Sequence, residues 1–188
     1  MLRMAFAVTA LLFSINVFAA PTANEVIGEI QKIVLKQSAE RAGNWVIGDQ
    51  NNYNIDMGFI QGTMEMSVKD IVPEGIWLLQ NANLGFLGAQ VIETLIDPAT
   101  GKVLKMLVNG QEQEPPVLNV ELIEVIDATV TVPAGTFDCQ HIRLLNKDDN
   151  KEMKMWSSGL VPLSGLVKSI NPSQFGNVTT ELTSFHKN

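Results

Sequence analysis

Cys139 and His141 are the residues whose types and spacing could form a nucleophilic pair. Two positions apart on a β-strand, they would share one face, because successive strand side chains alternate between faces. A thiol beside an imidazole can act as an activated nucleophile. Cys139 is also the only cysteine of the chain, and a free cysteine often behaves as a small buried apolar residue. The pattern favours the structural thiol, and we predict no catalytic residue.

Metal and phosphate sites lack their sequence signatures. His141 and His186 are far apart, and neither has a Glu or His at metal-ligand spacing. Residues 85–88 (GFLG) have neither the lysine nor the spacing of a phosphate loop. Residues 147–150 (KDDN) lack the alternating oxygen ligands of a calcium loop. We therefore predict no metal and no cofactor.

Paired methionines are more informative. Met64 and Met66 lie two apart, Met153 and Met155 do the same, and Met106 belongs to a third apolar segment. Methionine is flexible and polarizable, so it suits an apolar surface that adapts to its ligand. One interpretation is a soft cavity lining for an acyl chain or an apolar peptide. The other is ordinary core filling, and both stay open.

The segments that carry these side chains have the pattern of strands. Residues 63–69 (TMEMSVK) alternate, with Met64, Met66 and Val68 on one face. Similar alternation predicts strands at 102–108, where Leu104 and Met106 would share a face, and at 118–124, 129–132, 152–156 and 178–185. Trp156 follows Met155 and is therefore predicted on the opposite face. Turn residues punctuate the chain, for example at 49–52 (DQNN), 133–135 (PAG) and 147–150.

The N-terminal region has two different patterns. Residues 1–19 combine Arg3, an apolar stretch and the signal-peptidase pattern VFA at 17–19, which predicts a signal peptide cleaved after Ala19 and export to a periplasm. The apolar stretch is shorter than the roughly 20 residues that span a bilayer. Thr22 and Glu25 then form a capping box, and helical spacing of apolar residues predicts one amphipathic helix as far as Gly43. Residues 20–188 would form a single domain.

Charge and composition exclude several partners. The formal net charge of −7 argues against nucleic acid and against docking on anionic lipid headgroups. No second apolar span follows the signal peptide, so we expect no stable membrane insertion. A single cysteine excludes an intramolecular disulfide.

The fold class follows from the balance of strands and helices. About nine to eleven short strands without alternating helices predict a mainly β, antiparallel sheet. One helix cannot cover so many strands, and an uncovered apolar face would aggregate. We therefore predict that the sheet curls around the helix as a half-open or closed barrel.

An uncharged loop follows the strand that carries Met153 and Met155. Residues 157–167 (SSGLVPLSGLV) contain Leu160, Leu163 and Leu166 at intervals of three, and we expect these leucines to point inward together. The loop would then fold over the mouth of a cavity as a lid, or close the end of the barrel as a fixed plug.

Three segments carry a family resemblance. Residues 130–145 (VTVPAGTFDCQHIRLL), 151–169 (KEMKMWSSGLVPLSGLVKS) and 95–111 (LIDPATGKVLKMLVNGQ) resemble a pattern of exported bacterial proteins. These look like members of the outer-membrane lipoprotein-sorting superfamily, the LolA/LolB type. The resemblance implies an incomplete antiparallel β-barrel with an apolar cavity that holds lipoprotein acyl chains.

These observations predict a non-enzymatic periplasmic carrier or binding protein for a lipid, an acyl chain or a lipoprotein. The predicted ligand-binding residues are the inward-facing apolar side chains Met64, Met66, Val68, Leu104, Met106, Met153, Met155, Leu160, Leu163 and Leu166. The alternative is an interaction module with a dry core that holds an envelope protein through its loop and sheet edge. An enzyme that uses Cys139 is the third hypothesis.

Overall fold

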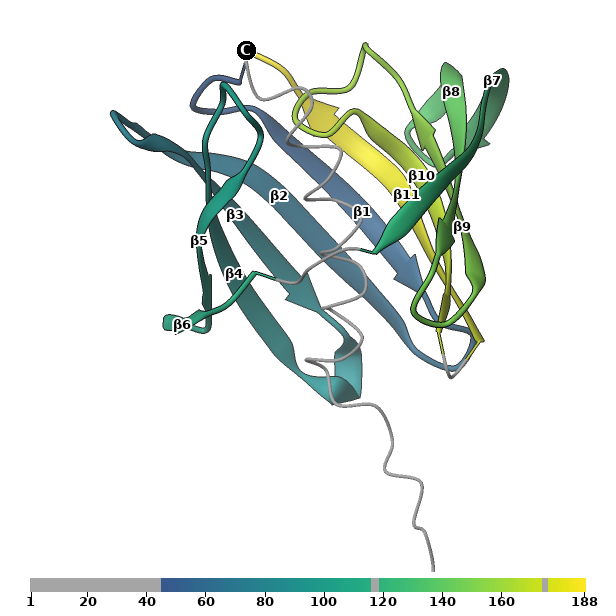
Figure 1. Cartoon of the computed structure of the whole chain (residues 1–188), viewed down its shortest axis with the longest axis horizontal. Helices are drawn as coiled ribbons and strands as arrows, with labels where there is room; N and C mark the ends of the chain where they lie inside the picture. Colours follow the sequence, from purple (N-terminus) through teal and green to yellow (C-terminus); the bar gives the residue numbers. More distant parts are fainter. Residues whose placement is uncertain (1–44, 116–118, 174–175) are drawn as a thin grey trace, which may run out of the picture.

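The computed structural model describes residues 45–115, 119–173 and 176–188, and the strands in these ranges form a single antiparallel sheet (Figure 1). The described residues form eleven strands and one short 3₁₀ helix in the order β1 (Gln50–Asp56), β2 (Gln61–Val72), β3 (Gly75–Asn83), η2 (Gly85–Leu87), β4 (Ala89–Ile96), β5 (Val103–Val108), β6 (Gln111–Gln113), β7 (Val120–Val132), β8 (Gly135–Asn146), β9 (Lys151–Ser157), β10 (Leu166–Ser173) and β11 (Gly176–His186). No helix in these ranges is long and apolar enough to cross a membrane.

The strand order shows how the sheet is built. It runs β6-β5-β4-β3-β2-β1-β11-β10-β9-β8-β7, so two meanders are joined where the first strand pairs with the last. The two outermost strands, β6 and β7, are not paired with each other among the described residues, and the sheet is open. Figure 1 shows it curled, with β3–β5 and β8–β9 rising on opposite sides of β1 and β11. The predicted mainly β class, the strand number and the incomplete barrel are confirmed. The predicted signal peptide and helix lie outside the described residues.

The core lies on the inner face of this curled sheet. Met64 lies opposite Tyr53 of β1, and Met155 lies opposite Ile142 of β8. The inward-facing side chains of neighbouring strands therefore form cross-strand rows. Tyr53, Met66 and Met155 are at most 1% exposed. The methionines are therefore part of one continuous apolar layer.

Two predictions about local structure are wrong. Residues 49–52 (DQNN) were expected to turn, yet Gln50–Asp56 is the strand β1, paired on both sides. Tertiary pairing overrides the turn preference of the asparagines there. Residues 120–124 and 129–132 of the two predicted strands lie in one long strand, β7, with a register shift between Leu122 and Glu124. The predicted turns at 133–135 and 147–150 lie where the structure turns.

Candidate functional site

The inner methionine face brings most of the predicted binding residues together. Met64, Met66 and Val68 of β2 are buried on it, and so are Met106 of β5 and the β9 pair Met153 and Met155. The register confirms that these side chains share one face, because Met66 pairs with Asn51 and Met106 pairs with Thr94 along inward-facing rows. Flexible thioethers on three strands give this face the ability to repack around different shapes.

Leu104 does not belong to this face. The prediction is wrong because β5 has a register shift: Leu95 pairs with Lys105, but Ile96 pairs with Val103. The shift leaves Leu104 as the extra residue of a β-bulge, and its side chain is 45% exposed.

The loop between β9 and β10 is a plug packed on the inner face. Val161, Leu163 and Leu166 are each at most 3% exposed, as expected for two of the three leucines. Leu160 is the exception, since it is 67% exposed, and its predicted inward position is wrong. The chain reverses direction within residues 158–165, where Ser158 N–H donates to the carbonyl of Gly165 (2.8 Å) and Leu163 adopts φ 57°. A left-handed residue breaks the spacing of three on which the expectation depended.

Three buried donors hold the plug in place. Trp45 Nε1 donates to the Leu163 carbonyl (3.1 Å), Asn51 Nδ2 donates to the Pro162 carbonyl (2.9 Å), and the Tyr53 hydroxyl donates to the Leu166 carbonyl (3.2 Å). Asn51 Nδ2 also donates to the Tyr53 oxygen (3.0 Å), so two of the anchors are coupled. Burial raises the pKa of Tyr53 well above its ordinary value, which keeps the hydroxyl protonated and able to donate. These bonds favour the plug over the lid.

Edge strand β7 carries four exposed apolar side chains close together. Leu122, Ile123, Val125 and Ile126 are each at least 45% exposed. Leu122 pairs with Leu144 and Val125 pairs with Ile142, so both lie on the inner face, whereas Ile126 pairs with His141 on the outer face. The inner face is thus buried over β2, β5 and β9 but open at β7. Sequence analysis missed this feature, although four apolar residues within five positions are the signal of a strand apolar on both faces.

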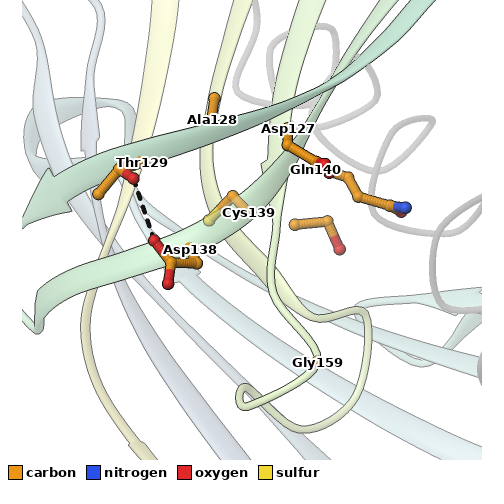
Figure 2. Close-up of a pocket in the computed structure, with 8 residues that line it drawn as sticks. Asp127, Ala128, Thr129, Asp138, Cys139, Gln140 and Gly159 are labelled. Atoms are coloured by element: carbon orange, nitrogen blue, oxygen red, sulfur yellow. Dashed lines mark hydrogen bonds between the residues drawn. The ribbon is translucent and has the colours of Figure 1, made fainter.

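A hollow of about 730 Å³ lies between β7, β8 and the plug (Figure 2). Its lining includes Asp127 and Asp138, the amide of Gln140, and Gly159 from the plug. Thr129 Oγ1 donates to Asp138 Oδ1 (3.0 Å) across the hairpin. The hollow is polar and acidic at its rim, so it differs from the predicted apolar cavity.

The thiol of Cys139 lies in the wall of this hollow and is buried. Burial, together with the charge of Asp138, raises the pKa of the thiol to about 11, so it stays protonated at neutral pH. A thiolate nucleophile needs the opposite shift.

His141 is engaged elsewhere. Its ring stacks on Trp156 with centroids 4.3 Å apart and planes 5° apart. Burial, with Lys154 and Arg143 nearby, lowers the pKa of the imidazole. Trp156 pairs with His141 on the outer face, as predicted from its position after Met155.

Ion pairs cover the outer face beside this stack. Arg143 Nε donates to Glu152 (2.6 Å) and its Nη1 donates to Glu124 (2.7 Å), which joins β7, β8 and β9. The hydrogen bonds from Arg143 lower the pKa of Glu152. No group of three His, Cys, Asp or Glu side chains within the described ranges could hold a metal ion.

Comparison with known proteins gives one distant match. No protein-family model matches the chain, and no curated protein matches it. Among solved structures, it is similar to the crystal structure of MucB, with a TM-score of 0.43 and 9% sequence identity over 84% of this chain. The match spans 58% of the MucB chain. The resemblance to the lipoprotein-sorting superfamily stays a prediction.

Proposed function

We propose that the protein is a non-enzymatic periplasmic binding protein that takes up the acyl chain of a lipid or lipoprotein on the inner face of its open sheet. The observation that supports this proposal is the methionine face itself, in which five methionines from β2, β5 and β9 share the inner face of a sheet whose outermost strands, β6 and β7, are not paired with each other among the described residues. An acyl chain offers no polar group to recognise, so adaptable apolar contacts are sufficient.

The acyl chain would reach this face from β7. Leu122 and Val125 are the inner-facing apolar residues that remain exposed there, and Leu160 of the plug is exposed beside Gly159, which lines the same hollow as Asp127. The carboxylates of Asp127 and Asp138 would disfavour an anionic headgroup at this point. A zwitterionic or uncharged head is therefore the better match.

The energetics are adequate for reversible carriage. Each buried CH₂ contributes about 0.8 kcal/mol, so ten of them contribute about 8 kcal/mol. That free energy corresponds to a Kd of about 1 μM, before the entropic cost of ordering the acyl chain is subtracted. Because the face is already packed, uptake requires the methionines to change rotamers.

Lipid analysis of protein purified from a membrane-containing host tests the proposal. We expect co-purified lipid in native mass spectra, and displacement of a fluorescent acyl probe with a zwitterionic head. The proposal fails if only the ligand-free mass is found and no probe binds.

Two adjacent residues provide a matched pair of variants. Val125 and Ile126 are both 45% exposed but lie on opposite faces of β7. Val125→Glu places a carboxylate on the proposed path and should weaken probe binding at least about tenfold, a change of about 1.4 kcal/mol. Ile126→Glu adds the same charge on the outer face and should leave probe binding unchanged. Equal losses in both variants would contradict the inner-face path.

A second function is favoured by the edge itself. β7 is thirteen residues long, pairs only with β8 among the described strands, and exposes apolar side chains on both faces. Such an edge can accept an extended segment of another protein by strand addition. On this hypothesis the protein is an envelope interaction module with a dry core. A stoichiometric protein partner, no bound lipid, and loss of the partner in both Val125→Glu and Ile126→Glu would favour it over the carrier.

The absence of enzymatic activity is also part of the proposal. The protonated, buried thiol of Cys139 and the stacked imidazole of His141 support it, since neither is poised for nucleophilic attack. Cys139→Ala should keep full probe binding and full function in vivo. Loss of function without loss of folding in this variant would contradict the proposal.

A further inference from the structure

The outer face of β1–β4 carries a second hollow, of about 430 Å³. Two cross-strand rows form it: Asn54–Thr63–Asn83–Ala89 and Asn52–Glu65–Asn81–Val91. The residues between these rows point to the buried inner face, so the hollow opens outward. The asparagines lie about 6.6–6.8 Å apart along β1 and β3, and the two pairs are about 9.5 Å apart across β2. This array is separate from the methionine face.

Three asparagines of the array, Asn52, Asn54 and Asn81, lie inside paired strands and contradict local preference, whereas Asn83 is the last residue of β3. Asparagine is depleted in strands and favoured in turns, which is why the sequence around Asn51 and Asn52 predicted a turn. A sequence that violates a local rule on an exposed face, where packing does not require it, indicates a functional constraint.

Much of the hydrogen-bonding capacity of this array is unused. Within the described part of the chain, Asn54, Asn81 and Thr63 make no side-chain hydrogen bond. Asn83 uses only its Oδ1, as an acceptor from Gly85 N–H (3.1 Å). Each amide offers two donors and one acceptor, the combination that matches a hydroxyl able both to donate and to accept.

The array is almost uncharged. Glu65 is the one charged side chain among the described residues that line it. Lysines elsewhere on this face are engaged in ion pairs, Lys69 with Glu93 and Lys168 with Glu181. With a net charge of −7 and no cation in the lining, the hollow disfavours anionic ligands.

Two exposed phenyl rings are carried by the loops at the end of the strands that bears Asn54 and Asn83. Phe59 is 65% and Phe86 is 76% exposed, on the loops that follow β1 and β3. These loops are neighbours, since a Cβ on Gly85 would lie 3.5 Å from the Gln61 carbonyl. Aromatic rings beside amides offer an apolar surface for the C–H face of a sugar ring, next to partners for its hydroxyls.

We propose that this outer hollow is a binding site for a neutral glycan, with the amides of Asn54, Asn81 and Asn83 holding sugar hydroxyls and Phe86 packing on a ring. The site is independent of the acyl-chain path, which lies on the opposite face of the sheet.

Titration calorimetry of the purified protein with three probes tests the site: a tetramer of N-acetylglucosamine, maltohexaose, and heparin as an anionic glycan. We expect at least one neutral oligosaccharide to bind and heparin not to bind. The double variant Asn54→Ala/Asn81→Ala should weaken binding at least about tenfold, and Phe86→Ala about threefold or more. Gln113→Ala removes an exposed amide on β6 and should change the affinity less than about twofold.

A second measurement, on the unmodified protein, distinguishes a loss of binding from a loss of folding in the variants. In ¹H–¹⁵N spectra of the unmodified chain, the side-chain amide signals of Asn54, Asn81 and Asn83 should shift on titration, while that of Gln113 stays in place. Val125→Glu should bind the glycan normally. No heat and no amide shift with either neutral probe at millimolar concentration would overturn the proposal, as would preferential binding of heparin or unchanged affinity in the double variant.

Discussion

Removing the hydroxyl that anchors the plug should loosen it measurably. Tyr53→Phe takes from the Leu166 carbonyl its donor at 3.2 Å and from Asn51 Nδ2 one of its two acceptors, at 3.0 Å. Both groups are buried, and leaving a buried polar group unpaired costs about 1–3 kcal/mol. Part of this cost is offset because the phenol no longer has to be buried, so we expect a net loss of about 1–2 kcal/mol in the free energy of unfolding. For a chain of this length that lowers Tm by about 2–8 °C.

Urea denaturation followed by tryptophan fluorescence measures the loss as a lower midpoint with an unchanged m-value. Asn51→Ala removes two donated bonds, to the Pro162 carbonyl and to Tyr53, and should cost about 2–3 kcal/mol. Since the two side chains share a bond, the double variant should lose at least about 0.5 kcal/mol less than the sum of the single losses. Asn54→Ala, on the exposed face, should stay within about 0.5 kcal/mol of the unmodified protein.

Hydrogen exchange locates the effect. If the hydroxyl holds a plug, amides of residues 158–165 should exchange faster in Tyr53→Phe, while those of β3 and β4 keep their protection. Strictly additive losses in the cycle, or a uniform loss of protection over the whole sheet, would refute the description of a plug held by coupled anchors.

Three further outcomes follow from single residues. Gly62→Ala should destabilise the protein by about 1–3 kcal/mol, because the new Cβ would lie 2.4 Å from a backbone carbonyl of β3. The Cβ of Gly159→Ala would meet nothing within 4 Å, so this variant should be near neutral. Thermal denaturation compares the stabilities of the two variants. Cys139 should react with iodoacetamide far more slowly in the folded chain at pH 8 than in urea, because burial raises its pKa to about 11; equal rates would contradict this. The pKa of His141 is lowered by folding, so its contribution to stability is complete above about pH 6.5 and is lost as the pH falls through the lower folded-state pKa. His141→Phe keeps a ring against Trp156 and should flatten the pH dependence of unfolding in that range.

Strand alternation predicted the larger part of the site. A side chain two positions along a strand returns to the same face whatever the surrounding fold, so Met64 with Met66, and Met153 with Met155, could be placed together from the sequence. The opposite placement of Trp156 followed from the same rule. The same alternation made a mainly β sheet the natural class.

The errors occur where one residue interrupts that rule. A β-bulge leaves Leu104 itself exposed, and the chain reversal that contains the left-handed residue Leu163 leaves Leu160 exposed; neither interruption leaves a signal in the spacing of apolar residues. The strand nature of the asparagine-rich β1 was hidden because pairing with β2 and β11 outweighs local preference.

The sequence by itself therefore determined which side chains share a face, because that depends on the two-residue period of a strand. The tertiary structure decided which faces stay exposed and what covers the rest. It joined β1 to β11, left β7 as an open edge, and anchored the plug through Trp45, Asn51 and Tyr53, which lie more than a hundred residues away along the chain. Such contacts depend on strand order and register across the whole sheet, and no local pattern encodes them.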